Sequence, residues 1–221
     1  MKSEKDQRIM DQYRCPTGIE GMKVAASMNI HHSDLTDWGL SKVKIGSDFT
    51  ILDVGCGGGK TINKLANLAP QGEVYGIDCS KDMVKYSQEV NKDLINQDRV
   101  SIVEGFVDKT GFPDSFFDLV TAIETYYFWP SLSDVFQEVH RILKPQGHLL
   151  LINEMIEDGT YEIENKETIK KTHVHLISIT EIKDALKKVG YKKIQIFKKT
   201  GTPWNTILAQ KNYVQPRTSV P

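Results

Sequence analysis

The chain has 221 residues, a length that suits one ordinary domain or one domain with a small appendage. Hydrophobic residues make up 39% and charged residues 26% of it, as in globular proteins rather than disordered or fibrous ones. Lysine and arginine number 28 against 29 acidic residues, for a formal net charge of −1. This balance argues against a nucleic-acid partner, because proteins that hold a phosphate backbone usually carry a basic excess or stripe.

Three features of the sequence favour a cytoplasmic protein. No stretch approaches the roughly 18 apolar residues that a membrane span requires. Residues 1–10 are polar and contain no apolar core, so we expect no secretory signal. Cys15, Cys56 and Cys79 form neither an even set nor a CxxC pair, which indicates reduced thiols and no cysteine metal site.

The N-terminal segment, residues 1–45, differs in pattern from the rest of the chain. Two short helices are predicted in it, over 19–28 and 34–43. In an open α/β sheet such a segment can form a lid over the ligand crevice, which opens at the carboxyl ends of the strands. The alternative is that the segment only covers an exposed edge of the sheet.

Residues 46–211 alternate short apolar runs with helical periodicity, a pattern typical of one α/β domain. Buried strands are predicted at 50–54, 73–77, 100–104, 116–123 and 148–153. Helices are predicted at 61–68, 83–94 and 132–143, and Pro145 and Gly147 mark the turn after the last of them. Strands that alternate with helices in this way predict a doubly wound, mostly parallel sheet.

The C-terminal part predicts one more helix and a hairpin. Ser178 and Glu181 have the spacing of a capping box, in which each residue satisfies a backbone N–H of the other. Apolar and polar residues alternate over 191–198 and 204–211, as in two antiparallel strands. These two strands bring the number of strands in the predicted sheet to seven. We expect a mobile connection over 155–172 and a flexible tail over 212–221.

A glycine-rich loop, Asp53–Thr61, lies between the first predicted strand and its helix. Glycines let the backbone turn sharply and approach a ligand closely, and the helix N-terminus offers free N–H groups. A P-loop would need a glycine where Val54 stands, and a dinucleotide-binding loop would need one where Lys60 stands. The spacing that is present is Asp-x-Gly-x-Gly-x-Gly, formed by Asp53, Gly55, Gly57 and Gly59.

This spacing resembles motif I of the class I S-adenosylmethionine-dependent methyltransferases. Further matches to the family follow along the chain, at Val74–Asp78, at Ser80 and Met83, at Phe117–Val120 and at Arg141–Gly147. Together they span about residues 51–153 and imply a Rossmann-like methyltransferase fold. The closest branch is that of small-molecule enzymes resembling quinone-biosynthesis C-methyltransferases.

The resemblance implies S-adenosylmethionine as cofactor, S-adenosylhomocysteine as product and a small-molecule methyl acceptor. The Asp78 carboxylate would accept hydrogen bonds from both ribose hydroxyls, facing a wet crevice and holding little of the core. Met83 would pack on the adenine face. The residues expected at the cofactor are Asp53, Gly55, Cys56, Gly57, Asp78, Cys79, Met83, Phe106, Val107 and Glu124.

One position departs from the family pattern. Phe106 stands where the family often has an aspartate that bonds the adenine amino group, and its ring cannot accept a hydrogen bond. That contact is then absent, or it passes to Asp108 or to water, while the Val107 N–H can still face adenine. We expect weaker adenine selectivity rather than loss of binding, because one hydrogen bond contributes only about 0.5–1.5 kcal/mol.

Methyl transfer from a sulfonium is an in-line displacement that depends mainly on alignment, and it needs a general base only if the acceptor is protonated. Glu124, after the fourth predicted strand, is the candidate catalytic residue, or else a carboxylate that caps the next turn. Tyr126 and Tyr127 are predicted to line the acceptor pocket, and Phe128 and Trp129 to pack in the core.

Other polar residues are weaker candidates. Asn153 and Glu154 follow the fifth predicted strand, and His32, next to His31 in the N-terminal segment, is a candidate substrate contact or base. Arg14 could reach the cofactor carboxylate, with solvent exposure as the alternative. His173 and His175, with no third ligand nearby, do not support a zinc site.

Two classes of function remain open. The first is an S-adenosylmethionine-dependent methyltransferase that acts on a small molecule. The alternative is a non-catalytic cofactor-binding module of the same fold, suggested by Phe106 and by the lack of a compelling base. Neither the acceptor nor the oligomeric state can be predicted.

Overall fold

The structure is a computed structural model that describes residues 14–157 and 176–212, together with Gln12, Tyr161, Lys166, Ile169 and Val174. Most of the predicted connection over 155–172 and of the predicted tail over 212–221 lies outside these residues. His173 and His175 lie outside them as well.

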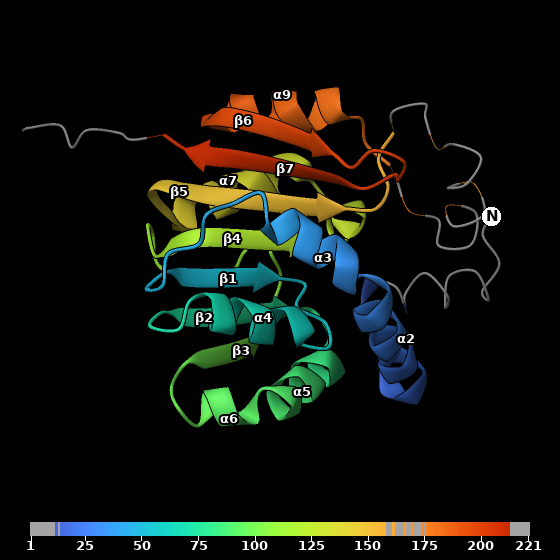
Figure 1. The fold of residues 1–221 in the computed structure, drawn as a ribbon, viewed down its shortest axis with the longest axis vertical. Coiled ribbons are helices and arrows are strands. Elements are labelled where there is room, and N and C mark those ends of the chain that lie inside the picture. The colour runs from blue at the N-terminus through green and yellow to red at the C-terminus, as the bar shows by residue number, and fades with distance from the viewer. Residues whose placement is uncertain are drawn as a thin grey trace, which may run out of the picture.

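A seven-stranded sheet crosses the middle of the molecule in the order β3-β2-β1-β4-β5-β7-β6 (Figure 1). The strands are β1 (Thr50–Val54), β2 (Glu73–Asp78), β3 (Val100–Glu104), β4 (Phe117–Ile123), β5 (Leu143–Asn153), β6 (Tyr191–Lys198) and β7 (Asn205–Lys211). The first five run parallel, whereas β7 is antiparallel to both β5 and β6. The predicted α/β sheet with its terminal hairpin is confirmed.

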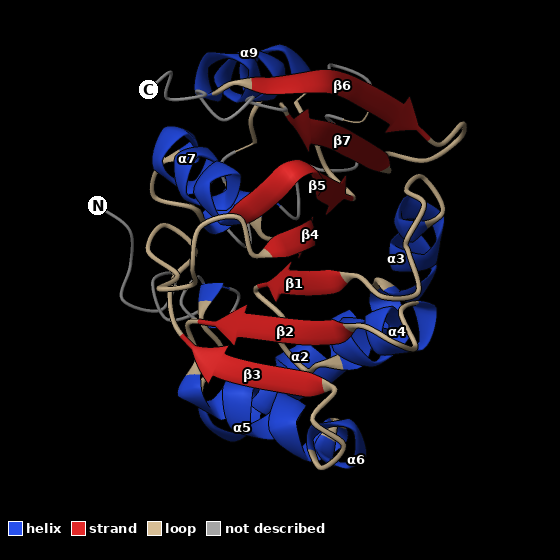
Figure 2. Ribbon diagram, turned by 90° about the vertical axis from the view of Figure 1, so that its left-hand side faces the viewer, coloured by secondary structure: helices blue, strands red, loops and turns tan. Residues whose placement is uncertain are grey.

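Helices cover both faces of this sheet, as its apolar strands require (Figure 2). The helices are α2 (Gly18–His31), α3 (Ser33–Leu40), α4 (Lys60–Leu68), α5 (Lys81–Val90), α6 (Lys92–Ile95), α7 (Leu132–Ile142) and α9 (Ile179–Val189), with a 3₁₀ turn η1 (Tyr126–Phe128). Side chains of α3, α4 and α5 pack with strand side chains in one hydrophobic core, and those of α7 and α9 pack with strand side chains in the other. The periodicity of α7 explains its place, since Val135, Phe136, Val139 and Ile142 are buried on one face.

Several element ends differ from the sequence predictions. The predicted capping box of α9 is present, because Ser178 Oγ accepts from the Glu181 N–H and Glu181 Oε2 accepts from the Ser178 N–H. The helix predicted over 83–94 is divided at Asn91 into α5 and α6. Leu143 pairs with Phe117 ahead of an irregularity in the β4–β5 register, so β5 starts before the predicted turn at Pro145.

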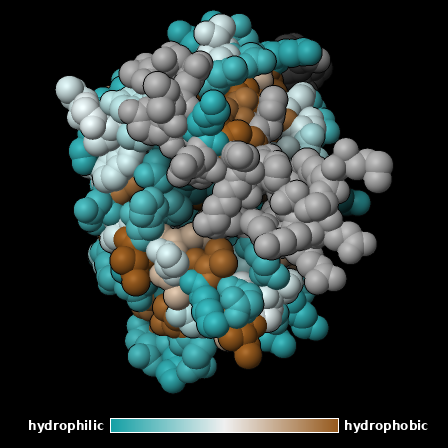
Figure 3. All heavy atoms as spheres, turned by 90° about the vertical axis from the view of Figure 1, so that its right-hand side faces the viewer, coloured by the Kyte–Doolittle hydropathy of each residue, from teal (hydrophilic) through white to brown (hydrophobic). Residues whose placement is uncertain are grey.

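The N-terminal helices occupy two places. α3 lies on the sheet face and packs so closely that a Cβ on Gly39 would come within 2.5 Å of Ile152. α2 lies against α5 beyond the carboxyl ends of the parallel strands (Figure 1). α2 exposes Ile19, Met22 and Ile30, and hydrophobic side chains gather on the lower half of that side of the molecule (Figure 3). The lid function of this segment stays a prediction.

In the part of the chain that the structure describes, every helix is too short or too polar to span a bilayer.

Candidate functional site

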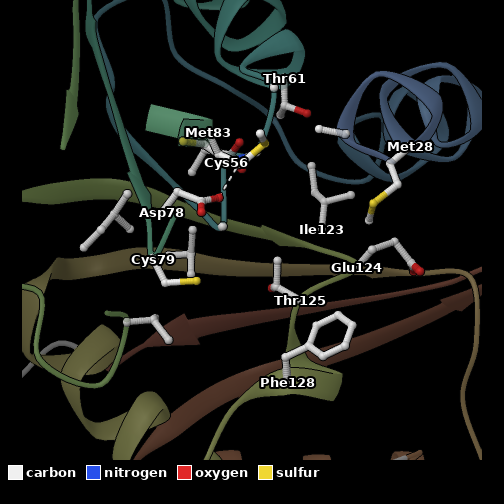
Figure 4. A pocket seen from close by; sticks show the side chains of 18 of the residues that line it. Met28, Cys56, Thr61, Asp78, Cys79, Met83, Ile123, Glu124, Thr125 and Phe128 are labelled. Carbon is white, nitrogen blue, oxygen red and sulfur yellow. Dashed lines mark hydrogen bonds between the residues drawn. The ribbon is translucent and has the colours of Figure 1, made fainter. Parts of the chain in front are cut away.

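A cavity of about 570 Å³ opens at the carboxyl ends of the parallel strands. It lies where the order of the strands reverses, between β1 and β4, which is the usual ligand site of an open α/β sheet. Asp78, Cys79 and Met83 lie on one side of it, and Glu124 and Met28 lie on the other (Figure 4). The volume is in the range of small-molecule sites.

The glycine loop forms the wall on the Asp78 side. Gly55, Gly57 and Gly59 have φ angles of 67°, 48° and 76°, in the left-handed region that favours glycine. A Cβ on Gly55 would lie 2.5 Å from Thr125, whereas a Cβ on Gly57 would meet nothing closer than 4.0 Å. The loop therefore turns tightly against the protein at Gly55 and leaves its Gly57 side open.

Asp78 ends β2 and holds this loop in place. Its Oδ2 accepts from the Gly57 N–H at 2.8 Å, and its Oδ1 accepts from the Ser80 N–H at 2.8 Å. Burial raises the pKa of the Asp78 carboxyl, and these two hydrogen bonds oppose that rise. Asp78 lines the cavity, but the expectation that it holds little of the core is wrong, because only 7% of the residue is exposed and it holds two backbone N–H groups.

Asp53 is a second buried carboxyl at the same end. Its Oδ1 accepts from the Thr121 hydroxyl at 2.7 Å, and burial raises the pKa of Asp53 to about 7.

Met83 is fully buried, while 61% of Phe106 is exposed. The structure brings all ten residues predicted at the cofactor to the lining of this cavity, and Asp108 and Arg14 line it too. Their contact with the cofactor stays a prediction.

Glu124 marks the opposite end of the cavity, directly after β4. Its φ of 57° is unusual for a residue other than glycine and turns the chain from the strand into η1. Glu124 Oε1 accepts from the Tyr127 hydroxyl at 3.1 Å and from the Glu154 N–H. Burial raises the pKa of Glu124 to about 7, against the opposing effects of His32 and of these hydrogen bonds.

His32 lies between α2 and α3 and faces two carboxylates. Its Nε2 is 3.9 Å from Glu124 Oε2 and 3.7 Å from Glu154 Oε2. Burial lowers the pKa of His32, but the Glu154 hydrogen bond and the charges of both glutamates outweigh burial, and the net shift is upward. His31 adds a second imidazole, with Nε2 at 3.2 Å from Glu154 Oε2. The sequence identified these residues one by one but not their convergence.

The structure contradicts the predicted placement of the two tyrosines of the aromatic run. Tyr126 and Tyr127 are buried in the core behind the cavity; the Tyr126 hydroxyl donates to the Met155 carbonyl at 3.2 Å, and the Tyr127 hydroxyl accepts from the Met155 N–H at 3.0 Å. Phe128 and Trp129 are half-buried; they pack against the core, as predicted, and they also line the cavity. The turn after Glu124 places both tyrosine hydroxyls at Met155, and the chain leaves the turn in an extended conformation at Trp129.

Asn153 also differs from its predicted role. It is buried at the β5–β7 pairing, where its amide donates to Asn205 Oδ1 at 3.2 Å. It therefore contributes to the sheet, whereas Glu154, the residue after β5, contacts His32, which lines the cavity.

Residues 52–151 match the family model of a methyltransferase domain. The chain is 27% identical over 158 residues to a sterol 4-C-methyltransferase of Caenorhabditis elegans, which covers 72% of this chain and 45% of that protein. It is 35% identical over 117 residues to a demethylmenaquinone methyltransferase of Listeria welshimeri, which covers 52% of this chain and 48% of that protein. The chain thus spans about half the length of the curated relatives it matches.

The fold is also similar to that of a solved structure, phosphoethanolamine N-methyltransferase 2 of Haemonchus contortus in complex with phosphomonomethylethanolamine and S-adenosylhomocysteine. The TM-score is 0.76 at 16% identity, over 96% of this chain and 61% of the other. At this identity the likeness concerns the fold alone.

Proposed function

We propose that this chain, whose residues 52–151 match the family model of a methyltransferase domain, is a class I S-adenosylmethionine-dependent methyltransferase that transfers the methyl group of that cofactor to a small-molecule acceptor. The observation that carries the proposal is one cavity with two chemically different ends. The glycine loop and Asp78 form one end, and Glu124 with His32 forms the other. Donor and acceptor can therefore meet inside a single site.

The Asp78 end suits the cofactor. The open side of Gly57 leaves room for a ligand against the loop backbone, and the buried Asp78 carboxylate offers acceptor oxygens for ribose hydroxyls. Met83 supplies an apolar surface for the adenine ring. When bound, S-adenosylmethionine supplies a methyl group made electrophilic by the positive charge on sulfur.

The Glu124 end suits an acceptor with an apolar body and a polar reacting group. Met28, Phe128 and Trp129 supply apolar and aromatic surface, and Glu124 and His32 supply polar groups beside it. Relatives named for sterols and demethylmenaquinone support an apolar acceptor class. A carboxyl with a pKa of about 7 is matched to removing a proton near neutral pH. We therefore assign Glu124 as the general base and His32 as its positioning residue.

Two measurements test this function. Calorimetric titration with S-adenosylhomocysteine is expected to show one binding site per chain, and labelled methyl from S-adenosylmethionine is expected to enter a small molecule from a metabolite extract. No binding of S-adenosylhomocysteine at millimolar concentration would refute the proposal.

The exposed Phe106 favours a second candidate, a cofactor-binding module without catalysis, because it stands where the family often places an adenine-binding acid. This candidate predicts that the protein binds S-adenosylhomocysteine but transfers no methyl group to any acceptor. Asp108, which also lines the cavity, is the residue that could replace the missing contact. Weaker adenine selectivity in an Asp108→Ala variant would identify it as that residue.

A further inference from the structure

Two imidazoles and a carboxylate converge at the α2–α3 junction, beside the acceptor end of the cavity. The ligand atoms of His31, His32 and Glu154 all lie within 4.8 Å of one another. The two closest pairs are His31 Nε2 to Glu154 Oε2 at 3.2 Å and His32 Nε2 to Glu154 Oε2 at 3.7 Å. Ligands about 2.0–2.2 Å from a tetrahedral zinc ion lie roughly 3.3–3.6 Å apart, which is close to the two histidine–glutamate separations. The two imidazoles, whose ligand atoms lie within 4.8 Å of each other, would have to approach.

The local fold explains why consecutive histidines can reach the same carboxylate. α2 ends at His31 and α3 begins at Ser33, with His32 at the break between them. The two rings meet edge to face, with centroids 5.1 Å apart, and both Nε2 atoms approach Glu154 Oε2. One oxygen thus faces two imidazole nitrogens, an arrangement that a shared cation satisfies.

The charges around this cluster also suit a cation. Glu124 adds a second carboxylate, with Oε2 at 3.9 Å from His32 Nε2. In the ranges 14–157 and 176–212, the ion pairs of Glu124 and Glu154 are with these histidines and not with any lysine or arginine. Two carboxylates and two neutral imidazoles would balance the charge of a divalent ion.

We propose that His31, His32 and Glu154 form a binding site for a divalent transition-metal ion, with an acceptor atom at the remaining position and the Glu124 carboxylate beside it. Imidazole nitrogen with carboxylate oxygen suits zinc and its first-row neighbours, whereas magnesium and calcium prefer oxygen ligands alone. The site itself is independent of methyl transfer, but its place beside an acceptor rests on the proposed function.

Zinc titration of chelator-treated protein, in the presence of a thiol reductant, tests the site. Wild type is expected to bind one zinc ion per chain, with no competition from millimolar magnesium. His31→Ala and Glu154→Gln should each weaken zinc binding by at least about 10-fold, as expected when a metal site is perturbed. The His31 side chain is 64% exposed, so its replacement leaves the fold intact.

Matched controls separate this site from other metal-binding groups. His148→Ala, the double variant His173→Ala/His175→Ala and Cys79→Ser should all bind zinc like wild type. Cobalt substituted for zinc should show d–d absorption bands without thiolate charge transfer. No zinc uptake by wild type, equal affinity in His31→Ala and Glu154→Gln, or loss of binding only in a control variant would overturn the proposal.

Binding of S-adenosylhomocysteine is measured in the same preparations with zinc chelated. Retained binding in His31→Ala, together with weakened zinc binding, supports the metal site and leaves the proposed function standing. If wild type binds S-adenosylhomocysteine but takes up no zinc, only the metal site is refuted.

Discussion

The Asp78 carboxylate both holds the glycine loop and presents oxygens to the cavity. Asp78→Ala is expected to weaken binding of S-adenosylhomocysteine by about 2–4 kcal/mol, or roughly 30- to 900-fold, because charge-assisted hydrogen bonds to the ribose are lost. It should also lower the free energy of unfolding by about 1–3 kcal/mol, since the Gly57 and Ser80 N–H groups lose their acceptor. Calorimetry and urea denaturation measure the two effects. Unchanged affinity in a folded variant would mean that the cofactor lies elsewhere.

Glu124 should control the rate of methyl transfer rather than cofactor affinity. Glu124→Gln keeps the shape of the side chain but removes the base, so methyl transfer is expected to fall by about 10²–10⁴-fold while S-adenosylhomocysteine affinity stays nearly unchanged. In wild type, kcat/KM should rise as the pH passes about 7, where the carboxyl ionises. A flat wild-type profile between pH 6 and 8, or full activity in Glu124→Gln, would contradict the assignment.

At the scale of elements, α3 depends on a glycine to lie flat on the sheet. A Cβ on Gly39 would come within 2.5–2.7 Å of three side-chain atoms of Ile152 on β5. Gly39→Ala is therefore expected to lower the free energy of unfolding by about 1–3 kcal/mol through overpacking. Urea denaturation measures this loss. Methyl transfer should fall as well, because α3 begins directly after His32.

A second substitution tests the cause of that loss. Ile152→Val in the same chain removes one methyl group from the crowded contact, so the double variant should recover part of the stability of wild type. If the double variant is less stable than Gly39→Ala by the full cost of Ile152→Val alone, the contact is not the cause.

For the molecule as a whole, two buried acids make stability depend on pH. The pKa values of Asp53 and Glu124 are raised by burial from 3.8 and 4.5 to about 7. Between those limits the folded state binds more protons than the unfolded state, so stability is full below the ordinary pKa values and is lost as pH rises through about 7. The shift of each group changes the free energy of unfolding by about 3–4 kcal/mol at most. Urea denaturation between about pH 4 and pH 8 should show this decline.

The variant Asp53→Asn/Glu124→Gln is the control for that pH dependence, and its stability should vary less with pH than that of wild type. His140 and His148, whose pKa values are lowered by burial, contribute a slope of the opposite sign below pH 6.5 in both proteins, so their effect cancels in the comparison. The pKa of Glu138 is lowered to about 2 by its hydrogen bond with Arg141, so its ionisation changes the stability only below its ordinary pKa of 4.5. Identical pH dependence in the two proteins would contradict the raised pKa values.

Much of the fold and the cofactor end could be predicted from the sequence, because both depend on local patterns. The alternation of apolar runs with helical periodicity determined the sheet and its two helical layers. The left-handed turns at Gly55, Gly57 and Gly59 need glycine whatever surrounds them, so their spacing was readable directly. Asp78 ends β2, the strand that lies next to β1, which places it beside that loop.

The acceptor end was decided by tertiary structure, because its residues come from separate parts of the chain. The turn after Glu124 places both tyrosine hydroxyls at Met155, while Phe128 and Trp129 line the cavity, and the sequence carries no signal for that turn. His31 and Glu154 are 123 positions apart and meet only because α3 packs on β5. Local spacing dictates how the backbone turns, whereas the packing of distant elements dictates which side chains converge.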